Sequence, residues 1–412
     1  MEKFILYGIE NDCKKILDTC KGVEKYIYCY IDPYTKRDEL YGINVYRPYV
    51  LNEDEYCEYK IIVTLDNKFH EIYDYLMDEY GIRKDRILTI WQFLSYILED
   101  TNVKLNPTFV RIESSTLCQL DCKECYMRKS DNGTMGYGYL KADVFQKFLD
   151  ENSYVKKIEL SNSGEAFLNP DMEKILRLAC ERNVEINFSA GVNFNDVSDS
   201  VLEALVECKV NKMTLSIDGA SQEIYSLYRK NGNFDRVIEN IKKLNAIKKR
   251  MDSEYPKLTW QFILMQHNQY EAEKASEMAK ELNMDIRFKL NWAKEEFVPY
   301  DSDKLCEVTG LNYFTRTDYN AHNEKNYYVS SICKQMLFSP QINWDGRLLG
   351  CCTVFKNDWG VNVFKEGLEW ALNSEQYRNA IIGLAGGNKD VAYNSPCGRC
   401  SKYKQFRSYT VV

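Results

Sequence analysis

Residues 118–125 read Cys118-Gln-Leu-Asp-Cys122-Lys-Glu-Cys125, and this stretch decides how the rest of the chain is interpreted. Its three thiols lie in the loop after an alternating, strand-like run at residues 110–113. A [4Fe–4S] cluster held by three cysteines keeps one iron open to a small molecule, whereas a structural cluster or a structural zinc normally takes four protein ligands. The spacing therefore predicts an iron–sulfur site with one open iron, on a loop after the first strand of a domain.

Strand-like and helix-like stretches alternate downstream of residue 108. The strand-like runs cover residues 110–113, 157–161, 185–189, 213–217, 259–264 and 286–290. Between them lie amphipathic stretches whose apolar residues repeat with the i, i+3, i+4, i+7 spacing of a helix face. This alternation is typical of a parallel sheet. Six such units predict a partial (β/α)6 barrel that binds its ligands at the C-terminal ends of its strands.

A separate small α/β domain is expected at residues 1–97. Strand-like runs at residues 4–7, 26–31 and 60–65 alternate with helical patterns. Their order resembles the Rossmann-like domains that are fused to enzymes of sugar and capsule biosynthesis. Only Gly8 stands where a dinucleotide fingerprint needs three glycines, so we expect no bound nicotinamide cofactor. A docking or dimerisation module is an equal alternative.

The complete prediction is an α/β chain in four parts. Residues 1–97 form the Rossmann-like domain, 98–107 a linker, 108–315 the partial barrel and 316–412 a small cysteine-rich domain. The linker is predicted because its residues are mostly polar, show no periodicity and end in Asn-Pro. The last part is set apart because the strand–helix alternation stops there while cysteines become frequent.

Composition narrows the range of partners. A net charge of −7 provides no basic field that would attract a phosphate backbone, so we expect no nucleic acid partner. No run reaches the ~18 apolar residues that span a bilayer, and the first nine residues lack the pattern of a signal peptide. We therefore expect a cytoplasmic protein without a membrane partner. In that compartment the 15 cysteines are metal ligands or small buried residues rather than disulfides.

The Cys-x3-Cys-x2-Cys loop after the first strand of a partial barrel resembles the radical S-adenosylmethionine (radical SAM) superfamily. The resemblance runs from about Phe109 to Cys400. It implies that Cys118, Cys122 and Cys125 hold a [4Fe–4S] cluster whose open iron is chelated by the amino and carboxylate groups of S-adenosylmethionine. It also implies that one electron breaks the sulfur–C5′ bond, and that the resulting 5′-deoxyadenosyl radical removes hydrogen from carbon.

The resemblance further assigns contacts to the bound S-adenosylmethionine. Glu165, in a stretch similar to the family's Gly-Gly-Glu-Pro, would accept the methionine ammonium. Ser216 and Arg229 would hold the methionine carboxylate, to which a bidentate guanidinium is suited. Asn193 matches the position of a ribose contact. Tyr126 is assigned to the adenine, although the family's aromatic position itself is occupied by a glutamate in this chain.

A second cysteine group consists of Cys333, Cys351, Cys397 and Cys400. Four thiols complete a tetrahedral site, and their spacing alone permits zinc. The first two cysteines and the glycine between them resemble the opening of the SPASM and twitch extensions of radical SAM enzymes. Because the chain ends soon after Cys400, it is similar to the shorter twitch form with one auxiliary [4Fe–4S] cluster. Zinc remains the alternative.

Five further residues are candidates for contact with substrate. Cys352, next to a predicted cluster ligand, would be the hydrogen-atom donor of an epimerase, or else a small buried residue. His267 follows the fifth strand at the catalytic rim, as a base or as a plain polar loop residue. Lys289, Asn291 and Trp292 stand at or just after the end of the sixth strand, where substrate contacts and structural packing are equally expected.

These features together predict a radical SAM oxidoreductase that dehydrogenates, or epimerises, a sugar-like or aminocyclitol-like substrate such as a nucleotide-sugar. A single auxiliary cluster suits a two-electron oxidation, since it can accept the second electron. A reductase, flavodoxin or ferredoxin is the expected electron donor. One alternative is a maturase of ribosomal peptides, and another is a zinc-bearing scaffold protein without catalysis.

Overall fold

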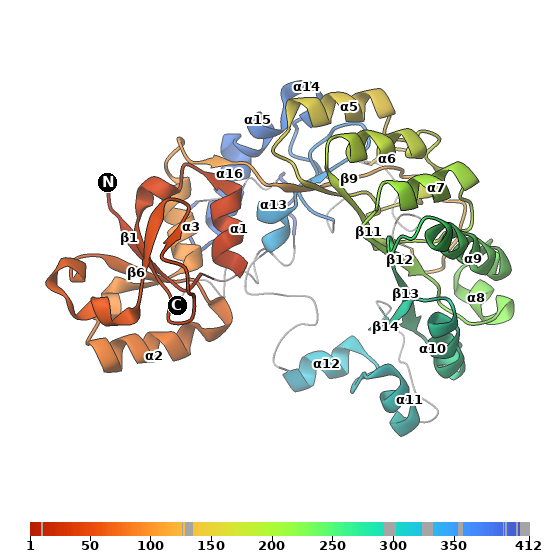
Figure 1. The fold of residues 1–412 in the computed structure, drawn as a ribbon, viewed down its shortest axis with the longest axis horizontal. Coiled ribbons are helices and arrows are strands. Elements are labelled where there is room, and N and C mark those ends of the chain that lie inside the picture. Colours follow the sequence, from red (N-terminus) through yellow and green to blue (C-terminus); the bar gives the residue numbers. More distant parts are fainter. Residues whose placement is uncertain are drawn as a thin grey trace. The chain divides into compact units, whose positions relative to one another are not determined.

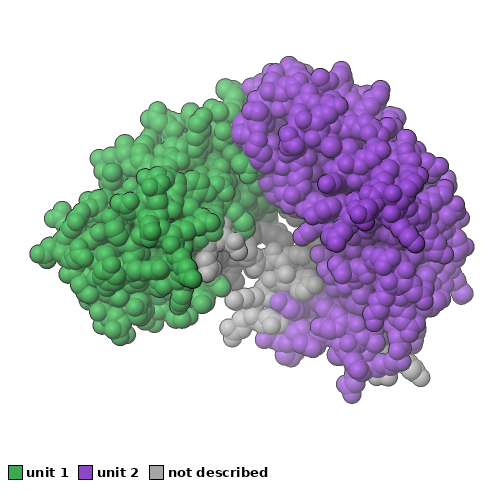
Figure 2. All heavy atoms as spheres, in the orientation of Figure 1, with its two compact units in different colours: residues 1–108, 331–339, 368–412 green, residues 109–330, 340–367 purple. Residues whose placement is uncertain are grey.

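The computed structural model describes most of the 412-residue chain. The described residues are 1–9, 11–125, 127, 135–291, 302–323, 333–352, 357–389, 391, 394–400 and 403, of which residues 11, 66 and 302 are described by their backbone alone. They fall into two compact units (Figure 2). Unit 1 comprises residues 1–108, 331–339 and 368–412, and unit 2 comprises residues 109–330 and 340–367. The predicted 316–412 domain is thus shared between the units, and the four-part division stays a prediction.

Unit 1 contains a six-stranded sheet in the order β4-β5-β3-β1-β6-β7, parallel except for the β4–β5 pair. Its strands are β1 (Phe4–Tyr7), β3 (Ile27–Ile31), β4 (Glu39–Leu40), β5 (Ile43–Tyr46), β6 (Lys60–Val63) and β7 (Ile87–Thr89). The central strand β1 is apolar and buried along its whole length, as a parallel strand covered on both faces must be. The predicted α/β fold of residues 1–97 is therefore confirmed.

Helices of unit 1 come from both ends of the chain. They are α1 (Asn11–Thr19), α2 (Phe69–Tyr80), α3 (Ile90–Leu98), α13 (Lys334–Phe338), α15 (Leu368–Leu372) and α16 (Glu375–Leu384). In the turn after β1, the Asp32 carboxylate accepts the Ile9 N–H at 2.9 Å, and Thr64 donates to the Gly8 carbonyl at 2.7 Å. These two hydrogen bonds fix the backbone of Gly8 and Ile9 directly after β1.

The predicted linker is tied to unit 1. Within it, β8 (Lys104–Leu105) pairs with β2 (Cys20–Lys21). Buried Arg378 donates to the carbonyls of Leu98, Asp100 and Val103 at and beyond the end of α3. A local sequence pattern could not predict that the linker is held in a fixed conformation, because Arg378 lies more than two hundred residues further along the chain.

Unit 2 contains the predicted partial barrel. Its parallel sheet has the order β14-β13-β12-β11-β10-β9-β15. The strands are β9 (Phe109–Ile112), β10 (Lys157–Glu159), β11 (Glu185–Val192), β12 (Lys212–Ser216), β13 (Lys257–Leu264), β14 (Asp285–Leu290) and β15 (Gln341–Ile342). Six of them are the predicted strands. The two-residue β15, which was not predicted, brings residues 340–367 into this unit beside β9.

Helices cover the outer face of this sheet (Figure 1). They include α5 (Ala142–Glu151), α6 (Met172–Glu181), α7 (Asp199–Glu207), α8 (Gln222–Tyr228), α9 (Phe234–Arg250) and α10 (Ala272–Glu281). Unit 2 further contains α11 (Ser302–Thr309), α12 (Arg316–Asn323) and α14 (Val363–Glu366). No helix in the described part of the chain is both long and apolar enough to cross a membrane.

The two faces of the barrel sheet differ in polarity, because successive residues of a strand point to opposite sides. Buried apolar side chains pack against the helices, among them Val110, Ile112, Ile158, Met213, Leu215, Trp260, Phe262 and Phe288. Alternating with them are the polar side chains of Arg111, Glu159, Thr214, Ser216, Gln261, Arg287 and Lys289. The inner face of the barrel is therefore hydrophilic.

Candidate active site

The three cysteines of the first group lie on the loop that follows β9. Cys122 is buried, Cys125 is half-buried and Cys118 is exposed. The Cys125 N–H donates to the Cys122 carbonyl at 3.1 Å, which forms a tight turn between them. The Asp121 N–H donates to the Lys230 carbonyl at 2.9 Å and so fixes the loop to the segment after α8. The loop lies at the C-terminal edge of the sheet, as predicted.

Two of the sulfurs receive hydrogen bonds from predicted cofactor contacts. Asn193 Nδ2 lies 3.6 Å from Cys118 Sγ, and Arg229 Nη1 lies 3.6 Å from Cys122 Sγ. Burial raises the pKa of the Cys122 thiol, while the Arg229 guanidinium opposes that shift. Donors of this kind stabilise thiolate sulfur and adjust the reduction potential of iron–sulfur clusters.

Arg229 is held by a carboxylate that the sequence analysis did not assign. Its Nε and Nη2 lie 2.7 and 2.6 Å from Asp218 Oδ2, and Asp218 is completely buried. The other oxygen, Oδ1, accepts the Ile263 N–H at 2.8 Å. Burial alone would lower the pKa of Arg229, but the Asp218 carboxylate holds it well above its usual range. The guanidinium is therefore fixed and permanently charged beside Cys122.

Glu165 is buried next to the same loop. One oxygen accepts the Asn193 N–H at 2.6 Å and the other the Phe167 N–H at 3.4 Å, at the start of a short 3-10 helix (Ala166–Leu168). Burial raises the pKa of the Glu165 carboxyl to about 7. A cation placed beside it would favour the ionised form, which fits the predicted contact with an ammonium group.

Glycine is required immediately before Glu165. Gly164 has a φ of +59°, and a Cβ atom there would lie 2.5 Å from the Ser115 carbonyl oxygen. The chain around Gly164 can therefore pass close to residues 115–117, and the Glu165 N–H donates to the Leu117 carbonyl at 2.7 Å. This approach brings the glutamate beside the cysteine loop.

Ser216 ends β12, where a Cβ atom on Gly191 would lie 2.5 Å from its hydroxyl oxygen. A glycine in β11 thus leaves the room that this hydroxyl occupies. Tyr126 lies outside the described residues, so its assignment to the adenine stays a prediction. Together, the structure brings Cys118, Cys122, Glu165, Asn193 and Arg229 around one loop, and places Ser216 on the neighbouring strand end.

His267 lies in the loop after β13. It is half-buried, and its Nε2 makes no hydrogen bond with any residue that the structure describes. Burial lowers the pKa of His267, although the Asp218 carboxylate nearby acts against this shift. Asn268 holds the loop by donating to the carbonyls of Asp218 and Ile263. The imidazole therefore lies near the ion pair beside the cysteine loop.

A second buried carboxylate, Glu113, was missed by the sequence analysis. It follows β9 directly and accepts the Ser163 N–H at 2.9 Å, the Ser163 hydroxyl at 3.0 Å and the side-chain amide of Gln341. Burial raises the pKa of Glu113 to about 8. This carboxyl group links β15 to the segment that carries Glu165. The hydrogen-bond partners of Glu113 lie far from it in the sequence, so no sequence motif identifies it as a buried carboxylate.

The cysteines of the second group fall in both units. Cys351 belongs to unit 2, and the neighbouring Cys352 is half-buried there. Nearby Leu349 packs with Met127, Met135 and Cys125, so the segment that carries Cys352 approaches the first cysteine loop. Cys333, Cys397 and Cys400 belong to unit 1, where the Cys400 N–H donates to the Cys397 carbonyl at 3.0 Å.

The chemistry of the first loop fits an iron–sulfur cluster, because three thiols lie on one loop after β9 and two side chains donate hydrogen bonds to their sulfurs. Within the described ranges, no three His, Cys, Asp or Glu side chains already stand close enough to hold a metal ion. Thiol ligands lose their protons and converge as metal binds. Both cysteine ligand sets therefore stay predictions.

Comparison with known proteins found a matching superfamily, relatives in sequence and similar solved structures. Residues 112–278 match the Radical SAM superfamily. The AdoMet-dependent heme synthase of Methanosarcina barkeri is 26% identical over 306 residues, which cover 71% of this chain and 77% of that protein. The probable GTP 3′,8-cyclase of Methanocaldococcus jannaschii is 26% identical over 160 residues, 39% of this chain and 50% of that protein. Among solved structures, Streptococcus suis SuiB bound to S-adenosylmethionine aligns with a TM-score of 0.51 at 17% identity, over 82% of both chains.

Proposed function

This chain carries a radical SAM domain, and we propose that it abstracts a hydrogen atom from carbon in order to dehydrogenate, or epimerise, a sugar-like or aminocyclitol-like substrate. When bound by Cys118, Cys122 and Cys125, the cluster and S-adenosylmethionine supply the one-electron cleavage that creates the hydrogen-abstracting radical. The observation that carries the proposal is the gathering of Glu165, Asn193 and Arg229 around this loop.

The protein's own part begins with holding the cofactor. The Glu165 carboxylate would accept the methionine ammonium, since its pKa of about 7 leaves it ready to ionise beside a cation. Arg229, already oriented by Asp218, and Ser216 would hold the methionine carboxylate. Asn193 would contact the ribose. Hydrogen bonds already orient the side chains of Glu165, Asn193 and Arg229. Little reorganisation of these three side chains would therefore accompany binding of the cofactor.

A hydrophilic substrate is supported by the inner face of the barrel. Thr214, Gln261 and Glu159 are buried polar residues on this face, and Arg287 and Lys289 extend it along β14. Hydroxyl and amine groups can form hydrogen bonds with such a lining, whereas an apolar substrate would remove water from these polar groups without forming hydrogen bonds to them. This polarity favours a sugar or an aminocyclitol.

Oxidation of a carbinol removes one hydrogen atom from carbon, one proton from oxygen and one electron. His267 would take the proton, because burial lowers its pKa and so keeps it neutral, and its Nε2 has no hydrogen-bond partner among the described residues. The predicted auxiliary ligands, Cys333, Cys351, Cys397 and Cys400, would hold a group able to accept the electron. In an epimerisation, Cys352 would return a hydrogen atom instead.

Deuterium transfer tests the proposal. The anaerobically reconstituted enzyme, with dithionite or flavodoxin as electron donor, would be incubated with sugars deuterated at their carbinol carbons and with deuterated peptides. Deuterium from a sugar in 5′-deoxyadenosine supports the proposal, and deuterium only from a peptide would replace it with a peptide maturase. Neither iron nor 5′-deoxyadenosine, with zinc bound, would identify a non-catalytic scaffold.

A further inference from the structure

We propose that Arg287, Lys289 and Arg316 form a subsite for an anionic group of the substrate, a phosphate or a carboxylate. The inference rests on the proposed function, because it assigns the anion to the molecule that reacts in the barrel. It names a class of substrate within that proposal: a neutral sugar would not use this subsite, whereas a sugar phosphate, a nucleotide-sugar or a sugar acid would.

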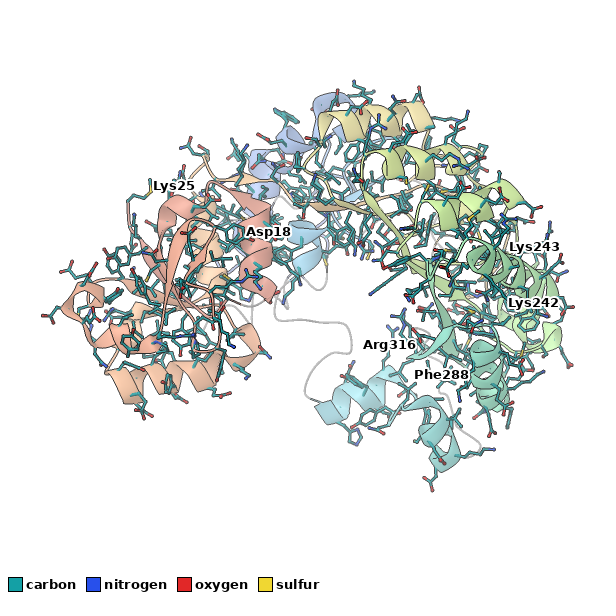
Figure 3. The ribbon with its side chains drawn as sticks, in the orientation of Figure 1. Asp18, Lys25, Lys242, Lys243, Phe288 and Arg316 are labelled. Atoms are coloured by element: carbon teal, nitrogen blue, oxygen red, sulfur yellow. The ribbon has the colours of Figure 1, made fainter. Side chains whose placement is uncertain are left out.

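The fold brings the three cations to one end of one strand. Arg287 and Lys289 are two residues apart on β14 and therefore point to the same, polar face of the sheet. Arg316 begins α12, and its Nη2 lies 3.4 Å from the carbonyl oxygen of Leu290, the last residue of β14. Figure 3 labels Arg316, at the start of α12, and Phe288, which lies on β14 between Arg287 and Lys289. The register aligns Arg287 with Gln261 and Lys289 with Ile263, on the adjacent strand.

Among the described residues, no group neutralises Arg287 or Lys289 in the way that Asp218 neutralises Arg229. Lys289 makes no hydrogen bond or ion pair with any described residue, although it is half-buried. The side chain of Arg287 has one long hydrogen bond, 3.4 Å to Gln261 Oε1. Buried Arg229, by contrast, has both Nε and Nη2 on the Asp218 carboxylate. Partial burial of a cation costs free energy when no counter-charge contacts it, and the proposed anion would supply the contact that Lys289 lacks among the described residues.

Mutual repulsion supports this interpretation. Burial and the charge of Arg287 lower the pKa of Lys289 to about 8; the Asp218 carboxylate opposes this shift, and the charge of Arg316 adds to it. An ammonium among two guanidinium groups costs free energy until an anion binds. The planar fork of an arginine and the ammonium of a lysine are the usual ligands of phosphate and carboxylate groups.

The subsite also lies on the side of the barrel where the reaction is proposed. Lys289 interacts electrostatically with Asp218, whose partner Arg229 donates to Cys122 Sγ. Bound there, an anionic group would hold the substrate by one end at the last strand while its reacting carbon faces the cysteine loop. Such an anchor positions the substrate without taking part in bond breaking.

Thermal unfolding of the reconstituted protein tests the subsite without requiring catalysis or the natural substrate. Inorganic phosphate and acetate would each be compared with chloride at equal ionic strength, for the wild type and for Lys289→Met, Arg287→Gln and the control Lys280→Met. Lys280 is an exposed lysine on α10 at the other end of the barrel. Phosphate stabilises proteins in general, and the response of Lys280→Met shows how large this general effect is.

We expect phosphate, acetate or both to raise Tm in the wild type and in Lys280→Met by at least about 1 °C more than in Lys289→Met and Arg287→Gln. A response to phosphate alone identifies a phosphate-bearing substrate, and a response to acetate alone identifies a carboxylate. Equal shifts in all four proteins, or no shift beyond chloride with either anion, would overturn the subsite. Deuterium transfer from a neutral sugar would still stand in that case, so the two proposals fail separately.

Discussion

Replacing Asp218 by asparagine tests whether its buried ion pair holds the end of the barrel together. Arg229 Nε and Nη2 lie 2.7 and 2.6 Å from Asp218 Oδ2, and only 14% of the Arg229 side chain is exposed. Asparagine keeps the shape of the side chain and can still accept the Ile263 N–H, but the guanidinium loses its counter-charge. Removing one partner of a buried pair costs about 3–5 kcal/mol. We therefore expect a loss of that size in the free energy of unfolding of unit 2.

Native-state hydrogen exchange measures this loss locally, because peptides that cover β13 report the opening of the strand that contains Ile263. Glu173→Gln is the matched control, since it removes an exposed carboxylate that lies 3.0 Å from Arg177 Nε, and it should leave protection unchanged. The double variant Asp218→Asn/Arg229→Gln should regain part of the loss, because no buried charge is left unpaired. If Asp218→Asn alters β13 protection no more than Glu173→Gln, the reasoning is refuted.

Three further predictions concern the buried groups near the cysteine loop. S-adenosylmethionine should bind more weakly as the pH falls through about 7, because Glu165 then becomes protonated and loses its charge for the ammonium. Equilibrium dialysis at pH 6 and pH 8 checks this. Glu165→Gln should bind S-adenosylmethionine on the order of tenfold more weakly than wild type at pH 8, and its affinity should not depend on pH in this way. Equal affinity of Glu165→Gln and wild type would contradict the assignment. Glu113 has a folded pKa of about 8 against an ordinary value of 4.5, so it should stabilise the fold fully below pH 4.5 and lose that contribution as the pH rises toward 8. Urea unfolding should show this slope in the wild type and not in Glu113→Gln; an identical slope in both proteins would count against it. Gly164→Ala should destabilise unit 2 and lower iron retention, because the added Cβ would collide with the Ser115 carbonyl. Gly310 has a similar φ of +66° but open space around it, so Gly310→Ala should cost only about 1–2 kcal/mol of backbone strain. Equal losses in the two alanine variants would show that the close approach at Gly164 is unimportant.

The strands of the barrel and the position of the cysteine loop were predictable because both are local in the sequence. The sequence runs that predicted β9 to β14 each cover at least four residues and are apolar or alternating, and the loop is a motif of fixed spacing after the first strand. Glu165 and Arg229 were found through motif positions. The structure brings these residues together because parallel strands end at one edge of the sheet.

The remaining features depend on partners far apart in the sequence. β15 has only two residues, too few to show a period, and its place beside β9 follows from long-range packing. Asp218 and Glu113 could be read as strand-end carboxylates, but their partners could not be known before the chain folded. Arg378 likewise holds the predicted linker from the C-terminal helix region. Pairings of this kind are determined by the tertiary structure and leave no periodic signal.

Iron content after anaerobic reconstitution tests the central claim most directly. Wild type would be compared with the triple alanine variant of Cys118, Cys122 and Cys125 and with the double alanine variant of Cys397 and Cys400. The account predicts about eight irons per chain in the wild type and about four in each variant, as expected for two independent [4Fe–4S] clusters. Iron content that is unchanged in the triple variant would contradict the assignment of the first cysteine loop.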